Sequence, residues 1–296
     1  MSKKLRPYAY SFPALAVIGL IVLFPIFYTG YISCTNMNIY HWFDFRWIGT
    51  ENYKKALFVF DSGFFPALLR TIAWTAINMI IQVIVAFFIA VLLNSEGLRL
   101  KNLYKTLLMF PWAMPAYVSI LLWRMGIYNT EFGLLNQWLK QLGLGPVNWL
   151  SNSSVAFFAC IIVNLWMAFP FMIMTIDGAL QSIDKSYYES ATLDGAGYFT
   201  KIRKITVPSL WPIIAPAVIM TTFTTFKQFD IIFLMTQQQG ANTGANVHTV
   251  ITYAYEKAFI TNNYGYSSAI SILIFVIIIV AFPIVSRRTM KEEGIG

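Results

Sequence analysis

Ile270-Ser271-Ile272-Leu273-Ile274-Phe275-Val276-Ile277-Ile278-Ile279-Val280-Ala281-Phe282 is an apolar run in which Ser271 is the one polar residue. Further apolar stretches of similar character lie upstream. A helix needs about 20 apolar residues to cross a hydrocarbon core roughly 30 Å thick. The sequence therefore predicts an all-α integral membrane protein with six transmembrane helices, at residues 10–33, 67–93, 104–126, 154–178, 209–233 and 265–286.

Composition and charge support a membrane protein and exclude an ordinary soluble domain. The chain has 296 residues, of which 57% are hydrophobic and 11% charged, whereas soluble domains carry about 25% charged residues. The formal net charge of +8 does not indicate nucleic-acid binding, because the basic residues gather in alternate loops. They are Lys3, Lys4, Arg6, Arg99, Lys101, Lys105, Lys185, Lys201, Arg203, Lys204, Arg287, Arg288 and Lys291.

This distribution also predicts the orientation of the chain. Basic residues concentrate in cytoplasmic loops of membrane proteins. We therefore expect a multi-pass cell-membrane protein with both termini, and the loops between spans two and three and between four and five, in the cytoplasm. The expected organisation is a tail, first span and outer loop at 1–66, a five-helix core at 67–286 with a cytoplasmic helix at 186–197, and a cytoplasmic tail at 287–296.

Polar and proline residues inside the spans predict where helices pack or bend. Asn78 and Gln82 are four residues apart and so share one helix face, which favours hydrogen bonds to a neighbouring helix because polar groups in hydrocarbon need partners. Pro111 and Pro115 predict a bend or break in the third span. A short interfacial helix is expected near 132–142 in the following outer loop.

The loop between spans four and five contains Glu189-Ser190-Ala191-Thr192-Leu193-Asp194-Gly195-Ala196-Gly197. Ser186 with Glu189 three residues later is a capping-box pattern, which predicts a short helix over Tyr187–Asp194. Gly195 suits its C-terminal stop, and Pro208 suits the start of the next helix. A helix this short is marginal alone in water. From the residues alone, it is either a capped connector or a docking element for a partner.

The same segment resembles the Glu-Ala-Ala motif of ABC importer permeases. Glu189, Ala191, Gly195, Ile205 and Pro208 occupy motif positions, while Ser190 replaces an alanine and Val207 a leucine. Other stretches resemble carbohydrate permeases: 45–53 (FRWIGTENY), 110–115 (FPWAMP), 133–136 (GLLN) and 178–183 (GALQSI). Nearly the whole chain resembles the first, maltose-transporter-type permease subunit of carbohydrate importers, in a compact six-helix form with the type I importer fold.

That resemblance implies the partners and the work of the chain. A second permease subunit would complete the pore, an ABC ATPase dimer using ATP and Mg would dock below, and an extracytoplasmic solute-binding protein would deliver oligosaccharides, most simply maltodextrin-like ones. The chain itself would bind no cofactor, metal or nucleic acid and would not be an enzyme. Contact with the ATPase would come from a coupling helix and its flank: Tyr187, Glu189, Ser190, Ala191, Asp194, Gly195, Ile205 and Pro208.

The resemblance places the sugar site in spans four and five. Amides and hydroxyls hydrogen-bond sugar hydroxyls, while aromatic rings cover their apolar faces. The implied substrate-binding residues are Asn164, Met167, Ala168, Phe171, Thr221, Thr224, Thr225 and Gln228. Lys227 is expected either to pair with Asp230, three residues on, or to serve an acidic sugar.

Several other functions lack their sequence signals. No Gly-x-x-x-x-Gly-Lys-Ser/Thr phosphate-binding loop is present, so energy must come from another chain or an ion gradient. His41 and His248 are isolated, and no nucleophile–base–acid arrangement suggests an intramembrane enzyme. The alternatives are an ABC permease for a non-sugar solute and an ion-coupled secondary transporter. The scarcity of membrane carboxylates and the absence of a visible inverted repeat disfavour the secondary transporter.

Overall fold

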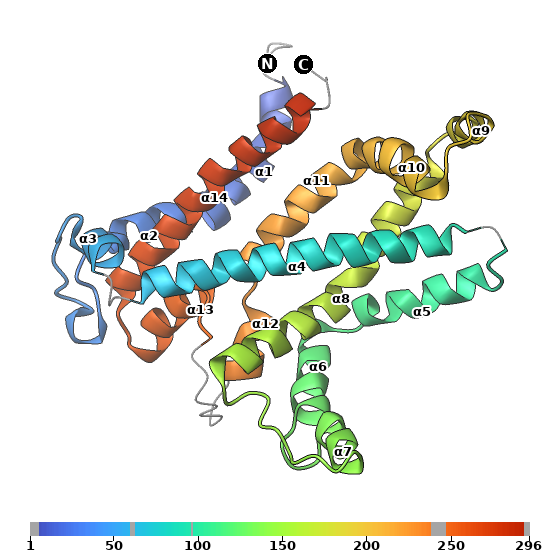
Figure 1. Cartoon of the computed structure of the whole chain (residues 1–296). Coiled ribbons are helices and arrows are strands. Elements are labelled where there is room, and N and C mark those ends of the chain that lie inside the picture. Colours follow the sequence, from blue (N-terminus) through green and yellow to red (C-terminus); the bar gives the residue numbers. More distant parts are fainter. Residues whose placement is uncertain (1–5, 60–62, 96, 238–246, 293–296) are drawn as a thin grey trace. The chain divides into compact units, whose positions relative to one another are not determined.

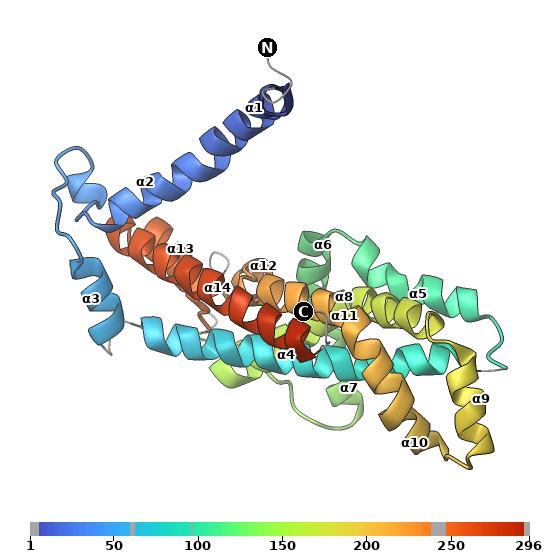
Figure 2. The same cartoon turned by 90° about the horizontal axis from the view of Figure 1, so that it is seen from above.

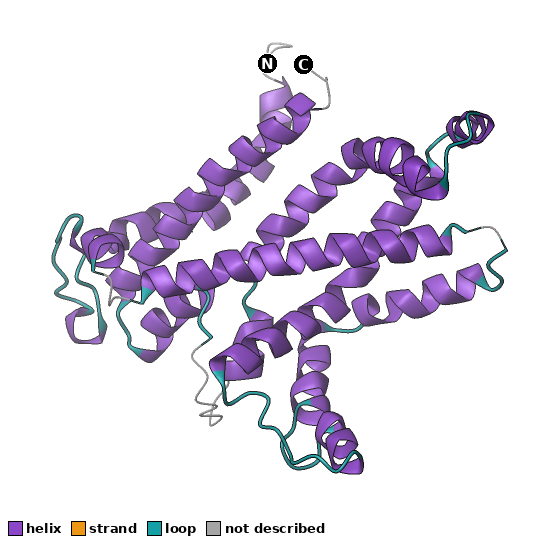
Figure 3. Ribbon diagram, viewed as in Figure 1, coloured by secondary structure: helices purple, strands orange, loops and turns teal. Residues whose placement is uncertain are grey.

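The computed structural model describes residues 6–59, 63–95, 97–237 and 247–292. Within these ranges the chain forms helices and loops without a β-strand (Figures 1 and 3). The α-helices are α1 (Arg6–Ile18), α2 (Phe24–Ser33), α3 (Glu51–Phe58), α4 (Phe64–Leu93), α5 (Lys101–Ala113), α6 (Ala116–Leu121), α7 (Leu134–Gln141), α8 (Ser153–Gln181), α9 (Lys185–Leu193), α10 (Tyr198–Lys201), α11 (Val207–Phe226), α12 (Asp230–Ile232), α13 (Val250–Tyr255) and α14 (Tyr264–Glu292). Shorter π-helical turns join several of them, at Gly19–Leu23, Leu122–Ile127, Ile202–Thr206, Phe233–Gln237 and Glu256–Ile260.

The predicted spans correspond to long apolar helical runs. Five in the described part of the chain are long and apolar enough to cross a membrane: Tyr10–Ser33, Phe64–Leu93, Ser153–Gln181, Tyr198–Thr236 and Tyr264–Ala281. A sixth crossing would be the pair Lys101–Ala113 and Ala116–Ile127, which is bent by 89°. The all-α membrane fold predicted from the apolar runs is therefore confirmed.

The predicted break in the third span lies at the second of the two prolines, Pro115, while Pro111 lies within α5. Met114 has an extended backbone, with φ −79° and ψ 143°, and separates α5 from α6. A residue before proline is driven out of the helical region by the ring of the proline that follows it. Pro115 therefore divides this span into two half-length helices.

The fifth span differs from its predicted bounds of 209–233. The helical path begins at Tyr198 and passes through the π-helical turn Ile202–Thr206 into α11. Pro208 lies in the first turn of α11, directly after the π-helical turn Ile202–Thr206. The path then leaves the helix at 227–229 before α12 begins, so this span too is interrupted.

The chain divides into two compact units, the first formed by residues 1–68 and 250–279. In this unit Asn52 of α3 is buried and donates from Nδ2 to the carbonyls of Ser33 and Thr35, at 2.9 and 2.8 Å. The start of α14 packs closely here, because a Cβ on Gly265 would lie only 2.2 Å from the Thr35 carbonyl oxygen. The loop after α2 is thus fixed against α3 and α14.

The second unit contains residues 69–249 and 280–296 and is organised around α8, which packs against α5 and α11. One core cluster surrounds the first half of α8 and includes Trp74 and Ile232; another surrounds its second half and includes Met172 and Leu210. Burial of these side chains stabilises the arrangement. We call the end of this unit where α4 and α8 finish, α5 begins and α9 lies the basic end (Figure 1). It carries Arg99, Lys101, Lys105, Lys185, Lys201, Arg203 and Lys204.

Candidate functional site

The short helix α9 follows α8 closely and turns away from it at the basic end (Figure 2). Its N-cap is Asp184, whose carboxylate accepts a hydrogen bond of 2.9 Å from the Ser186 backbone N–H. This bond, with a further one from the Ser186 side chain, holds the pKa of Asp184 below its ordinary value. The predicted capping box of Ser186 with Glu189 is wrong, because Asp184 supplies an earlier acceptor and α9 begins at Lys185. Glu189 is consequently not used in capping.

The C-terminus of α9 confirms the predicted glycine stop. Gly195 has φ +77°, a left-handed conformation that side chains disfavour. The Ala196 N–H donates to the Ala191 carbonyl at 2.8 Å, and the Gly195 N–H donates to the Thr192 carbonyl at 3.0 Å. These are the two bonds of a Schellman motif, which satisfy carbonyls that the helix end would otherwise leave open.

Two side-chain hydrogen bonds fix α9 to the segment that leads into α11. The Tyr188 hydroxyl lies 3.0 Å from Oγ1 of Thr206, which is 4% exposed. Lys201 donates from Nζ to Oγ1 of Thr192 at 2.7 Å. Because α8 leads directly into α9 and these bonds reach the next span, α9 connects the ends of the fourth and fifth spans.

A neighbouring face of α9, about 100° around the helix from Tyr188 and Thr192, is exposed in the described part of the chain. Glu189 and Leu193 are four residues apart and share a helix face; both are exposed, Leu193 to 90%. Tyr187 is also exposed, as are Tyr198 and Phe199 just beyond the Gly195 turn. Exposed apolar residues gathered around a polar helix are characteristic of a protein-binding surface. Among the other predicted coupling residues, Ser190 and Asp194 are exposed, Ala191 and Ile205 half-buried, and Pro208 exposed at the start of α11.

The residues predicted on α8 for substrate binding divide between a buried face and a more open one. Asn164 is 6% exposed and donates from Nδ2 to Oδ1 of Asn78 on α4 at 2.7 Å. One turn further, Gln82 donates from Nε2 to the Ala168 carbonyl at 3.0 Å. The predicted interhelical role of Asn78 and Gln82 is confirmed. Met167 is half-buried and Phe171 is 45% exposed, so Phe171 is the α8 member most open to a ligand.

The predicted residues of span five lie near the C-terminal end of α11. Thr225 is 6% exposed, and its carbonyl accepts a 3.2 Å hydrogen bond from Nε1 of buried Trp74. The Thr224 hydroxyl donates to the Thr221 carbonyl at 2.9 Å; local bonding of this kind is common for threonine in membrane helices. Gln228 lies past the end of α11 and is half-buried. No hydrogen bond among the described residues joins the α8 set to the α11 set, and their role in substrate binding stays a prediction.

The expected ion pair of span five is not formed. Lys227 and Asp230 are both exposed, and no ion pair between them occurs in the described ranges. The expectation treated them as one turn of a continuous helix. The structure ends α11 at Phe226 and begins α12 at Asp230, so the regular spacing that brings residues i and i+3 together is lost.

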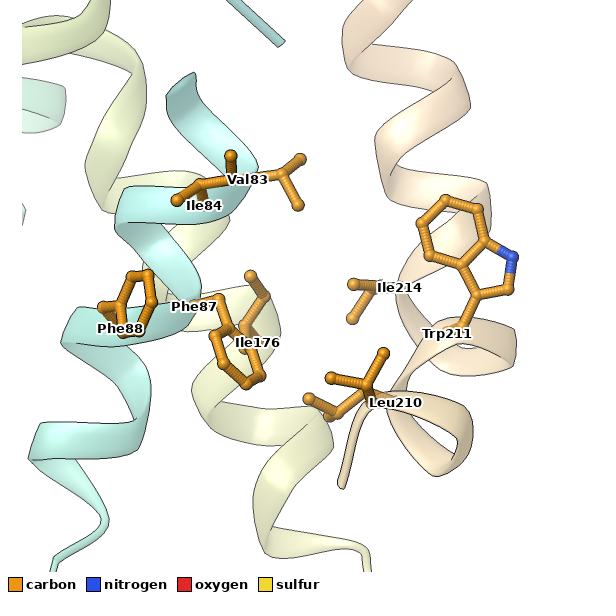
Figure 4. A pocket seen from close by; sticks show the side chains of 9 residues that line it. Val83, Ile84, Phe87, Phe88, Ile176, Leu210, Trp211 and Ile214 are labelled. Atoms are coloured by element: carbon orange, nitrogen blue, oxygen red, sulfur yellow. The ribbon is translucent and has the colours of Figure 1, made fainter. Parts of the chain in front are cut away.

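An apolar pocket of about 470 Å³ lies between α4, α8 and α11 (Figure 4). Its lining residues are Val83, Ile84, Phe87, Phe88, Ile176, Val207, Leu210, Trp211 and Ile214. None of the predicted substrate residues takes part. Since a sugar needs several hydrogen-bonding groups around its hydroxyls, this pocket does not have the lining of a sugar site.

A cluster around Asp177 was missed as a candidate site. Asp177 of α8 is 4% exposed and forms an ion pair with Lys105 of α5. Asn94 and Gln181 also donate to its carboxylate, at 2.7 and 2.8 Å. Lys105 and Asp177 are 72 positions apart in sequence, so no local spacing reveals the pair; the one available signal was a carboxylate inside an otherwise apolar span.

Long apolar helices, with the short capped helix α9 presenting an exposed polar and aromatic surface between two of them, define an integral membrane protein with a candidate docking site for a partner. Residues 82–287 match the family model described as "Binding-protein-dependent transport system inner membrane component". This range extends from α4 to α14 and includes α9. The chain therefore belongs to the family of binding-protein-dependent transport system inner membrane components.

Individual relatives support this membership. The chain is 33% identical to the galactooligosaccharides transport system permease protein GanP of Bacillus subtilis. The alignment covers 97% of this chain and 71% of GanP. It is 31% identical to the trehalose/maltose transport system permease protein MalF of Thermococcus litoralis. This alignment covers 94% of the chain and 91% of MalF. A crystal structure of a bacterial ABC transporter involved in alginate import matches with a TM-score of 0.82 at 18% identity, over 98% of both chains. The fold is that of a type I ABC importer permease.

Proposed function

We propose that this chain is the transmembrane permease subunit of an ATP-driven, binding-protein-dependent importer of oligosaccharides. It forms half of the translocation pore with a second permease subunit and works by alternating access. A separate ABC ATPase dimer hydrolyses ATP with Mg, and an extracytoplasmic solute-binding protein delivers the sugar. Family membership supports the transport role, and the named sugars of the relatives support the substrate class.

The observation that carries the coupling part of the proposal is the construction of α9. Its N-cap, Schellman stop and the Tyr188–Thr206 bond fix the helix to the permease, while Glu189 and Leu193 are exposed on a neighbouring face. A helix that is hydrogen-bonded to the permease and also exposed to a partner can transmit a displacement of the partner to the spans. We infer that the ATPase holds this exposed face, with a basic residue opposite Glu189; a partly exposed ion pair of this kind contributes only about 0–1 kcal/mol, so shape carries most of the coupling.

Orientation follows from the charge distribution. The basic end would face the cytoplasm, because lysine and arginine concentrate on that side of the membrane. Both chain termini would lie there as well. In this orientation α9 would lie on the side where ATP is available.

Within the substrate site, the open positions are the strongest candidates. Phe171 would stack on the apolar face of a sugar ring, and Thr221, Thr224 and Gln228 would contribute hydroxyl and amide groups. Asn164 and Thr225, which are buried against α4, would support the site rather than line it. A maltodextrin-like oligosaccharide fits neutral side chains of this kind.

The test is reconstitution of the complete transporter in proteoliposomes, with radiolabelled oligosaccharides ranked first by their binding to the cognate solute-binding protein. Uptake should require ATP inside the vesicles on the ATPase side and the loaded binding protein outside. Uptake that persists without ATP and follows a proton or sodium gradient would establish a secondary transporter instead. ATP-driven uptake of a non-sugar solute, with no oligosaccharide bound by the solute-binding protein, would support the permease role and contradict the proposed oligosaccharide substrate.

A further inference from the structure

The ion pair of Lys105 and Asp177 joins two spans inside the basic end of the second unit. The side chains are 23% and 6% exposed, respectively. Removing two charges from water is costly unless other groups replace the lost hydration. Apolar residues can often take the place of such a pair without loss of stability, so the groups around Lys105 and Asp177 decide what this pair contributes.

The surrounding amides provide that replacement. Asn94, which follows the last residue of α4, donates from Nδ2 to Oδ1 of Asp177 at 2.7 Å. Gln181, the last residue of α8, donates from Nε2 to Oδ2 at 2.8 Å. Lys101 donates to the amide oxygen of Asn94 at 3.4 Å and, in the described part of the chain, forms no ion pair with Asp177. The carboxylate thus collects donors from α4, α5 and α8.

Along the chain, the pair connects the end of α8, which leads into α9, with the half-span α5. On one side, Asp177 lies one turn before the end of α8, and the Asp184 cap of α9 follows almost at once. On the other side, Lys105 belongs to α5, which ends at the 89° break before α6. At that break the backbone of Met114 is extended, so the regular hydrogen bonds of α5 do not continue into α6.

We propose that Lys105 and Asp177 are a positioning pair that makes the half-span α5 follow the base of α9. This inference rests on the proposed function, because it assigns a route by which displacement of α9 by the ATPase reaches a pore helix. The pair gives one defined distance and direction between α5 and α8, which two apolar side chains able to slide past each other do not impose. Breaking it leaves ATP hydrolysis connected to α9 but not to α5.

The experiment compares variants of this chain in the complete reconstituted transporter. The quantity measured is radiolabelled maltotriose imported per ATP hydrolysed, together with ATPase retention and thermal stability of the complex. In Asp177→Asn and in the double variant Lys105→Met/Asp177→Leu, import per ATP should fall about fivefold or more. The charge-reversed variant Lys105→Glu/Asp177→Lys should recover at least half of the lost ratio, since it restores an ion pair between the same two positions of α5 and α8.

Lys101→Met is the matched control, because it removes a nearby lysine whose side chain donates to Asn94 and forms no ion pair with Asp177 within the described residues. Its import per ATP should stay within about twofold of the wild type. The double variant Lys105→Met/Asp177→Leu replaces both charges with apolar groups, which many proteins tolerate without loss of stability. A fall in its import per ATP would therefore report lost coupling and not misfolding.

Import per ATP equal to wild type in the double variant would overturn the proposal. So would loss of assembly in all three variants, including the charge-reversed one, since the pair would then be needed only for folding. If the wild-type complex imports no oligosaccharide with ATP, the proposed function fails instead. The two failures are therefore distinguishable.

Discussion

The hydroxyl of Tyr188 lies 3.0 Å from Oγ1 of Thr206 and joins the short helix α9 to the helical path that enters α11. Tyr188→Phe keeps the ring and removes this bond, whose net contribution is about 1 kcal/mol. Amide hydrogen exchange within α9 should quicken by roughly fivefold. Tyr187→Phe is the control, because Tyr187 is 61% exposed and makes no recorded side-chain hydrogen bond. Equal exchange in the two variants would mean that the Tyr188 bond does not hold α9.

Gly195→Ala should weaken the end of α9 because the residue has φ +77°. A left-handed conformation costs a residue with a Cβ roughly 1–2 kcal/mol, and no neighbour lies within 4 Å to add a clash. We expect several-fold weaker retention of the ATPase on the purified permease pair. Gly197→Ala is matched, since Gly197 has φ −72° and equally open surroundings. Loss of the ATPase in both variants would point to this loop in general and not to the left-handed turn.

Glu189→Lys should uncouple or detach the ATPase while the spans remain inserted in the membrane. The side chain is exposed and takes no part in capping α9, so the folded permease loses little. The introduced lysine would then repel the basic group that the ATPase is proposed to place opposite Glu189. Glu131→Lys reverses another exposed carboxylate, outside α9, and should leave ATPase retention unchanged. Full retention and transport in Glu189→Lys would make α9 a connector only.

Asn78 and Asn164 should show strong energetic coupling. Replacing either one by leucine leaves the other amide buried without its 2.7 Å partner, at a cost of about 1–3 kcal/mol in unfolding free energy. The double variant should be less destabilised than the sum of the single variants, because no unpaired amide remains. A double-mutant cycle on unfolding in detergent measures this. Additive effects would contradict the paired arrangement.

Phe171→Ala combined with Gln228→Ala should raise the oligosaccharide concentration needed for half-maximal uptake, with the maximal rate less affected. Stacking and hydrogen bonds to the sugar would both be reduced. Phe158→Ala is the control, since Phe158 is also an exposed aromatic residue of α8, at 57%, but lies nearer its other end. An unchanged concentration dependence would remove spans four and five from the substrate site.

Patterns within one helix predicted much of this molecule. The apolar runs predicted the spans, Pro111 and Pro115 predicted the broken third span, and the spacing of Asn78 and Gln82 predicted their interhelical bonds. Each of these effects depends on residues within a few positions of one another. The glycine stop at Gly195 belongs to the same group, because the left-handed turn is a local requirement.

Relationships between helices were harder to predict. Lys105 and Asp177 meet only because α5 packs on α8, and Trp74 reaches the Thr225 carbonyl for a similar reason. The expected Lys227–Asp230 pair assumed helical spacing across a segment where the helix is interrupted. The cap of α9 was misplaced because Ser186 and Asp184 both offer acceptors, and only the folded backbone selects Asp184.

The break at Met114 has a consequence for how the chain enters the membrane. α5 has 13 residues and so extends about 20 Å, which is short of a hydrocarbon core roughly 30 Å thick. Neither half of this span would be stable in lipid by itself, and the backbone groups at the break need a partner other than lipid. The third span should therefore settle into the bilayer only after α8 has been synthesised and can receive it. Chains truncated before residue 153 should leave this segment accessible to water-soluble labelling reagents, and chains extended beyond α8 should not.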